Sequence, residues 1–133
     1  MTLKRIFAAF IIGLVPVSAA ADETWRMQDG QAVYQKDLGN TALISVPYQG
    51  SRAMVYIDGL PGALNNRSRH GGYWIGPGQG RCSSILTGPD GYASRNWGRA
   101  QIIFDRSTFP SGFTLRTSSC QYDLEYSKRA EAN

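Results

Sequence analysis

The sequence predicts an all-β fold, a small antiparallel β-sandwich or barrel of about seven to eight short strands held by one disulfide. Three observations predict this fold class. Apolar and polar residues alternate with a period of two in several short segments, and turn-forming residues recur about every eight to 12 residues. No stretch carries an amphipathic helical pattern of useful length. The 133 residues contain no internal repeat, so we expect a single folded domain.

The first half of the chain contains three candidate strands. Residues 32–36 alternate briefly, and residues 41–46 and 52–58 each place three aliphatic or small apolar residues on one face. The connection 47–51 is of hairpin length and contains glycine, which predicts that the second and third strands pair as a hairpin. Residues 58–62 then supply the Gly and Pro of a turn.

The second half continues the pattern of strands and turns. Residues 63–70 hold at most a helical turn, and their Asn residues favour a loop. Strong turn signals lie at 88–91 and 108–112. The candidate strands in this half are 73–75, 82–86, 99–105, 113–117 and 122–126. The polar tail 127–133 is expected to be frayed.

The N-terminal residues 1–21 have the pattern of a secretory signal peptide. A basic pair precedes an apolar run over 6–17, and small residues suited to cleavage follow at 18–21. The apolar run is too short for a comfortable membrane span. We therefore expect an exported protein, periplasmic or secreted, whose single β-rich domain covers 22–133 and has no membrane association after cleavage.

The charge balance argues against nucleic acid as a partner. The signal segment holds two of the 14 basic residues and none of the 10 acidic ones, which leaves a net charge of +2. That value is too small to predict nucleic-acid binding. All but two of the remaining basic residues, Lys36 and Lys128, are arginine. Arginine suits carboxylates, aromatic faces and protein interfaces better than lysine does.

Cys82 and Cys120 are the only cysteines. An even count in an exported chain predicts a disulfide between them. In the chain-entropy model, closing a loop of this length stabilises the fold by about 4 kcal/mol. The spacing is not that of a redox pair, and a single histidine is too few to complete a zinc site with the cysteines, so we predict no metal and no cofactor.

Residues suited to catalysis are few. His70 is the only histidine and could act as a base, while Asp58, Asp90 and Asp105 could supply a pair of carboxylates. Each aspartate stands at a strand end or turn, where it usually caps backbone groups. The glycine-rich run 76–80 leads into a strand-like segment rather than a helix, so it does not predict a phosphate-binding loop.

Arginine and aromatic residues are concentrated between 65 and 99, where Asp90 is the only acid. Such residues dominate the energetics of protein interfaces, and aromatic rings also stack on sugars. The predicted binding surface consists of Arg67, Arg69, Tyr73, Trp74, Arg81, Arg95, Trp97 and Arg99. In the alternative interpretation, the two tryptophans belong to the core and the arginines only solvate the surface.

The function that fits these observations is that of an exported, non-enzymatic binding protein that recognises another protein, as an inhibitor or immunity protein does. A loop over 71–81 would project Tyr73, Trp74 and Arg81 into a cleft of the partner, such as a secreted or periplasmic enzyme. Two alternatives remain open: a module that binds cell-wall or surface glycan, and a small secreted hydrolase that uses His70 or an aspartate pair.

Overall fold

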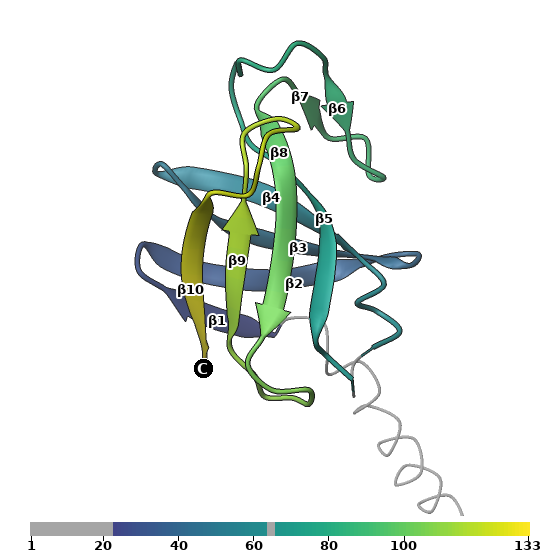
Figure 1. Ribbon diagram of the computed structural model, residues 1–133, viewed down its shortest axis with the longest axis vertical. Coiled ribbons are helices and arrows are strands. Elements are labelled where there is room, and N and C mark those ends of the chain that lie inside the picture. The colour runs from purple at the N-terminus through teal and green to yellow at the C-terminus, as the bar shows by residue number, and fades with distance from the viewer. Residues whose placement is uncertain (1–22, 64–65) are drawn as a thin grey trace, which may run out of the picture.

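The computed structural model describes residues 23–63 and 66–133, and this part of the chain is all-β. Eight antiparallel strands form a closed barrel, and two short strands form a small second sheet (Figure 1). The all-β prediction is confirmed, and the structure selects the barrel over the sandwich. The predicted signal peptide lies outside the described residues. Within the described ranges, no helix is long and apolar enough to cross a membrane.

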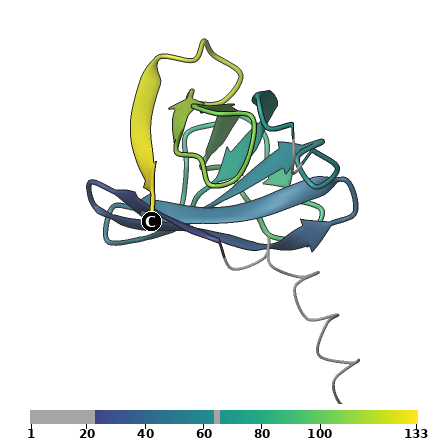
Figure 2. The same ribbon diagram turned by 90° about the horizontal axis from the view of Figure 1, so that it is seen from below.

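The barrel is a meander in which each strand pairs with its neighbours along the chain. Its strands are β1 (Thr24–Met27), β2 (Gly30–Leu38), β3 (Thr41–Tyr48), β4 (Ser51–Asp58), β5 (Arg69–Ile75), β8 (Trp97–Phe104), β9 (Phe113–Thr117) and β10 (Tyr126–Ala132). The small sheet pairs β6 (Leu86–Thr87) with β7 (Ala93–Ser94) and is inserted between β5 and β8. Pairing of β1 with β10 closes the circle, and Figure 2 shows the strands from the end where the C-terminus lies.

The predicted hairpin over the second and third candidate strands is confirmed. β3 and β4 pair from Tyr48 opposite Ser51 to Thr41 opposite Asp58. The two residues between them, Gln49 and Gly50, have φ angles of 47° and 77°. Positive φ at both positions is what a two-residue turn needs to match the twist of the flanking strands.

The barrel interior is packed by side chains from alternate positions of every strand. Trp25, Tyr34 and Phe113 are among its largest fully buried residues, and the ring of Trp25 meets that of Phe113 edge-on at 5.0 Å. Other members are Ile44, Val46, Val55, Ile57, Leu60, Ile102, Phe104 and Leu115. An eight-stranded barrel has an interior just wide enough to be filled in this way.

The end of the chain differs from the prediction. Residues 127–133 are not a frayed tail, because all but the last belong to β10, which pairs with β9 through five residues and with β1 through two. Arg129 and Glu131 alternate with Ala130, which is fully buried. The predicted strand over 122–126 is wrong up to residue 125, since β10 begins at Tyr126. Strand edges on both β9 and β1 stabilise a polar segment that has little β-preference of its own.

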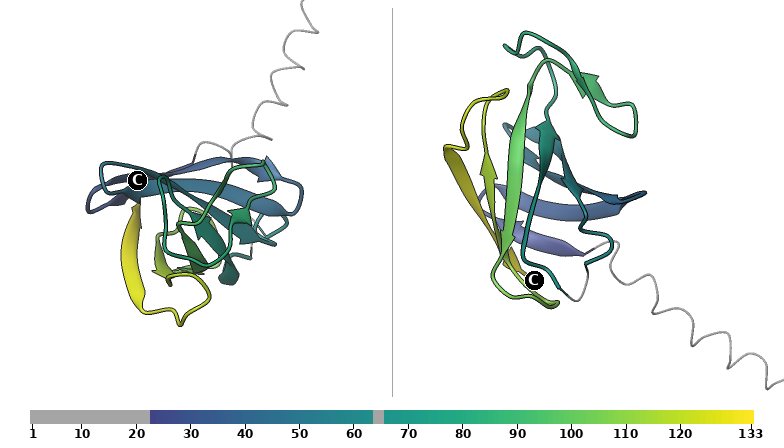
Figure 3. Two further views of the ribbon diagram at one scale, coloured as in Figure 1. Left: turned by 90° about the horizontal axis from the view of Figure 1, so that it is seen from above. Right: turned by 45° about the vertical axis from the view of Figure 1, so that its right-hand side comes forward.

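A second core lies outside the barrel, beneath residues 76–96, which we call the insertion. The predicted strand over 82–86 is reduced there to Leu86 in β6. The insertion covers outward-facing residues of β3, β4, β5 and β8, and this core comprises Leu43, Tyr56, Ile75, Cys82 and Trp97. The hydroxyl of Tyr56 donates a hydrogen bond of 2.9 Å to Asp90 in the β6–β7 turn. Figures 1 and 3 show the insertion extending past the ends of β5 and β8.

The two ends of the barrel are built differently. At the end opposite the insertion, Arg67 forms a buried bidentate ion pair with Glu23, and the indole of Trp25 donates to the carbonyl of Ser111 at 2.8 Å. We call this the closed end. At the other end, the insertion and the loop 118–125 surround an opening into the barrel, which we call the mouth.

Candidate binding sites

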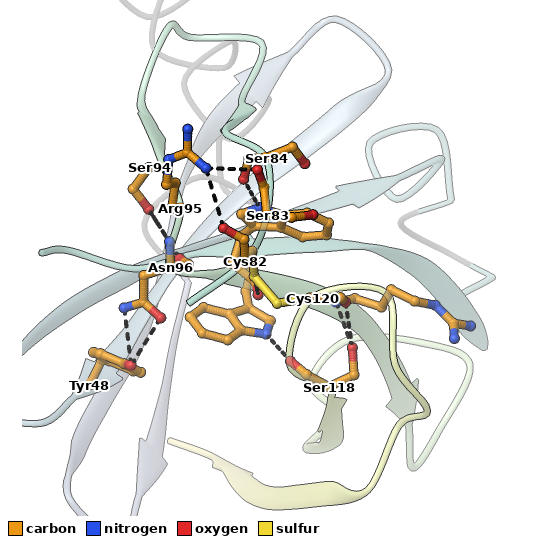
Figure 4. The surroundings of a disulfide bond; sticks show 12 residues. Tyr48, Cys82, Ser83, Ser84, Ser94, Arg95, Asn96, Ser118 and Cys120 are labelled. Atoms are coloured by element: carbon orange, nitrogen blue, oxygen red, sulfur yellow. Dashed lines mark hydrogen bonds between the residues drawn. A yellow bond between two sulfur atoms is a disulfide. The ribbon is translucent and has the colours of Figure 1, made fainter. Parts of the chain in front are cut away.

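The disulfide joins the two loops that border the mouth. Cys82 in the insertion bonds to Cys120 in the loop 118–125, so the predicted pairing is confirmed (Figure 4). Arg95 donates to the carbonyl of Ser83 at 2.7 Å, and the indole of Trp97 donates to the carbonyl of Ser84 at 2.9 Å. These contacts hold the insertion in place beside the bridge, so the rim of the mouth is ordered without a ligand.

Trp74 lies inside the mouth, where close backbone packing positions its indole ring. Its N–H donates to the carbonyl of Ser118 at 2.8 Å. Gly98 makes this contact possible, because a Cβ at that position would stand 2.5 Å from the indole nitrogen and 1.8 Å from the Ser118 oxygen. The ring of Tyr48 lies 5.6 Å from that of Trp74. The Tyr48 hydroxyl in turn bonds with the side-chain amide of Asn96 (Figure 4).

Two adjoining cavities make up the mouth. One of about 540 Å³ reaches between the inner faces of the strands, and one of about 830 Å³ runs between the insertion and the loop 118–125. The residues that line both are Tyr48, Gln49, Trp74, Asn96 and Ser119. Both volumes fall within the range of ligand-binding sites.

Three charged side chains line the mouth. Asp29 and Lys128 line the inner cavity and form an ion pair at 3.3 Å. Arg81 lines the outer cavity, is exposed, and has no hydrogen-bond or ion-pair partner among the described residues. The mouth therefore carries one uncompensated positive charge.

A second candidate site is the outer surface of β5, β8 and β9. The register of these strands places eight residues on it, and we call this surface the arginine face: Arg69, Gly71, Tyr73, Arg99, Gln101, Ile103, Thr114 and Arg116. Tyr73 and Arg99 stand directly opposite each other across the β5–β8 pair. The face holds three arginines and no acidic residue.

Side chains of the arginine face are held in place by neighbouring loops. Arg99 donates to the carbonyl of Tyr122 at 3.3 Å, and Arg116 donates to the carbonyl of Leu124 at 3.1 Å. Tyr73, which is 37% exposed, packs the edge of its ring against Trp97 at 6.2 Å. Arg99 and Arg116 are half-buried, and Tyr73 keeps part of its surface exposed to solvent.

The predicted binding surface is therefore divided among several environments. Arg67 is 2% exposed and Trp97 is 5% exposed, so neither contributes to an exposed surface. For Trp97 this confirms the interpretation as a core residue. Trp74 faces the mouth, and Arg81 lies on its rim. Arg69, Tyr73 and Arg99 share the arginine face, whereas Arg95 serves to hold the insertion.

The expected projecting loop over 71–81 is also wrong. Its first five residues belong to β5, because each pairs with a residue of β8. Only residues 76–81 leave the barrel, and they form one wall of a cavity. This part of the surface is therefore concave, whereas the sequence suggested a protruding loop.

Of the residues considered for catalysis, the three aspartates have structural partners, whereas Nε2 of His70 is buried without a hydrogen-bond partner among the described residues. Asp58 accepts a hydrogen bond from Thr41 at 3.0 Å, and Asp90 accepts one from Tyr56. Two hydrogen bonds from Arg129 hold the pKa of the Asp105 carboxyl below its ordinary value. His70 is half-buried opposite Ile102, on the inward side of β5. In the part of the chain that the structure describes, no group of three or more His, Cys, Asp or Glu residues could hold a metal ion.

Several residues of the two sites escaped sequence reasoning. Tyr48 and Asn96 are ordinary polar residues at the ends of strands, and only the meeting of distant loops brings them to Trp74. Arg116 could have been found, since the alternation in 113–117 places it on the polar face of a predicted strand. That alternation does not reveal the strand order, which places Arg116 on the same face as Arg99.

Comparison with protein-family models, curated proteins and solved structures finds no match to this chain.

Proposed function

We propose that this chain is an exported, non-enzymatic binding protein that docks an acidic surface of a partner protein on the arginine face. The observation that carries the proposal is the composition of that face. Arg69, Arg99 and Arg116 lie on three adjacent strands with Tyr73 among them, and none of the eight positions is acidic.

The chemistry of the face suits a protein partner. Arginine and tyrosine are the residues most often found in interface hot spots, because each combines a large apolar contact area with directed hydrogen bonds. A guanidinium group also matches a carboxylate in bidentate geometry. None of the three arginines has a carboxylate within ion-pair distance in the described residues, so a partner's Asp or Glu would meet uncompensated cations.

Arginine side chains of the face are already held in place in the unbound protein, which supports the same proposal. The carbonyls of Tyr122 and Leu124 fix the guanidinium groups of Arg99 and Arg116 before any partner arrives. Less side-chain entropy is then lost on binding. The disulfide that anchors the loop is consistent with a protein that works in an oxidising compartment.

Affinity capture with charge-reversed variants tests the proposal. The immobilised chain and its Arg69→Glu variant are exposed to an extract of exported proteins, and retained proteins are identified. Arg69 is the cleanest position because it is exposed and its side chain has no hydrogen bond or ion pair among the described residues. We expect a protein retained by the wild type, released by raised salt and lost from Arg69→Glu and Tyr73→Ala.

Lys36→Glu is the matched control, since Lys36 is an exposed cation on β2, away from the arginine face. Retention of the partner by this variant but not by Arg69→Glu would assign binding to the face. Equal retention by all variants would contradict the proposal. Co-sedimentation with insoluble peptidoglycan, unaffected by Arg69→Glu, would favour the glycan-binding alternative instead.

A further inference from the structure

We propose that the mouth of the barrel is a binding site for a linear alkyl carboxylate of medium chain length, with the chain in the inner cavity and the carboxylate at Arg81. The juxtaposition that carries this inference is an inner cavity, lined in part by inward-facing apolar residues, that shares five lining residues with an outer cavity lined by one unpaired cation. The site is separate from the arginine face, so the two proposals stand independently.

The inner cavity has the size and lining for an alkyl chain. Its volume is about 540 Å³, and the inward-facing residues Val46, Ala53, Val55 and Leu115 form its walls. The rest of the lining is mostly polar or aromatic. Eight-stranded barrels are wide enough to hold one small ligand when their interior is not fully packed.

The aromatic residues at the entrance present apolar surface because their polar atoms are already satisfied. The indole N–H of Trp74 donates to Ser118, and the Tyr48 hydroxyl bonds to Asn96. An alkyl chain lying against these rings would leave no buried polar group without a partner. A polar ligand at this point would have to break those hydrogen bonds or lose its own.

Charge determines which head group suits the site. Lys128 is compensated by Asp29 at 3.3 Å, so it offers little attraction to an anion. Arg81 is not compensated, and it lies next to Cys82, whose disulfide fixes the backbone of the rim. A single carboxylate would neutralise this charge and accept two parallel hydrogen bonds from the guanidinium. A neutral head group would gain less, and a cationic one would be repelled.

Titration of the full chain with decanoate, decanol and decyltrimethylammonium tests the inference, with each amphiphile kept below its micelle-forming concentration. Binding is followed by tryptophan fluorescence and by isothermal titration calorimetry. Trp74 and Trp97 both line the mouth, whereas Trp25 lies at the closed end, so a ligand-dependent change in emission reports the mouth. We expect saturable binding of one decanoate per chain, at least about tenfold tighter than decanol, and no binding of the cation.

Two variants separate the head-group site from the chain site. Arg81→Gln should weaken decanoate to the affinity of decanol and leave decanol unchanged, whereas Ala53→Leu should weaken both by filling the cavity. Arg106→Gln, an exposed arginine between β8 and β9 at the closed end, is the matched control and should bind decanoate as the wild type does. Near-ultraviolet circular dichroism verifies that each variant is folded.

Three results would overturn the inference. One is equal affinity of the wild type for decanoate and decanol, and another is unchanged decanoate affinity in folded Arg81→Gln. The third is tighter binding of an apolar tripeptide with a free C-terminal carboxylate than of decanoate, which would assign the mouth to a peptide terminus.

Discussion

Arg67 and Glu23 form two parallel hydrogen bonds of 2.9 and 2.8 Å, although 44 residues separate them in the chain. Both side chains are almost completely buried, and the guanidinium also lies 5.3 Å from the centre of the Phe104 ring. A cation in this position is a structural element of the closed end of the barrel. The pair joins the residue that precedes β1 to the segment that precedes β5.

Removing one partner of this pair should strongly destabilise the fold. Glu23→Ala leaves the Arg67 charge buried without a counter-ion, and we expect a loss of about 3–5 kcal/mol in the free energy of unfolding, measured with urea. Lys128→Ala breaks the exposed pair with Asp29 and should cost at most about 1 kcal/mol. Similar losses in the two variants would show that the Arg67–Glu23 pair is not buried as described.

The disulfide should account for a large part of the stability. Cys82 and Cys120 are 38 residues apart, and in the chain-entropy model a loop of that length contributes about 4 kcal/mol. The double variant Cys82→Ala/Cys120→Ala should unfold at a lower urea concentration by a corresponding amount. Addition of a reductant should lower the midpoint of the wild type and leave that of the double variant unchanged. An equal effect of the reductant on both would contradict this assignment.

Substitution of Gly98 should disturb the mouth specifically. A Cβ at this position would overlap the Ser118 carbonyl and displace the Trp74 indole, so Gly98→Ala should cost about 1–3 kcal/mol and shift the tryptophan emission. Gly62→Ala is the control, because an added Cβ there meets no atom within 4 Å. Unchanged emission in Gly98→Ala would mean that Trp74 is not held by Ser118.

The hydrogen bond between Tyr56 and Asp90 should hold the insertion against the barrel. Tyr56→Phe should cost about 0.5–1.5 kcal/mol and speed hydrogen exchange in the insertion. Burial, and then the bond to Asp90, raise the pKa of the Tyr56 hydroxyl. A raised folded-state pKa stabilises the protein below about pH 10 and ceases to do so as pH rises further. The difference between wild type and Tyr56→Phe should therefore shrink in strong alkali, and a constant difference would contradict the role of the hydroxyl.

Acid should weaken the network around Arg129. Hydrogen bonds from Arg129 lower the pKa of the Asp105 and Glu131 carboxyls. A lowered folded-state pKa stabilises the fold above about pH 5, where both carboxyls are ionised in the unfolded chain, and this contribution is lost as pH falls further. Because the side chains are exposed, Arg129→Gln should lower the free energy of unfolding only slightly at pH 7. The cost should disappear near pH 2, and a cost that persisted there would exclude an ionic origin.

The sequence by itself determined the features that depend on local patterns. Alternation and turn residues identified the hairpin of β3 and β4 and the strands β8 and β9, because a period of two and a glycine turn act within a few residues. The two cysteines determined the disulfide. Charge and aromatic content also pointed to Arg69, Tyr73 and Arg99, which share one face of the barrel.

Only the tertiary structure decided how the barrel closes and whether each candidate side chain is buried or exposed. Segment 127–133 is too polar to predict a strand, and it becomes one because β9 and β1 offer it hydrogen bonds from both sides. Arg67 and Arg69 look alike in the sequence, yet Glu23 draws one into the interior and leaves the other in solvent. Trp74 and Trp97 also lie in different environments. The strand pleat directs Trp74 into the barrel and Trp97 outward, where the insertion covers it. Burial of a side chain depends on what distant segments place beside it, and local periodicity carries no information about those segments.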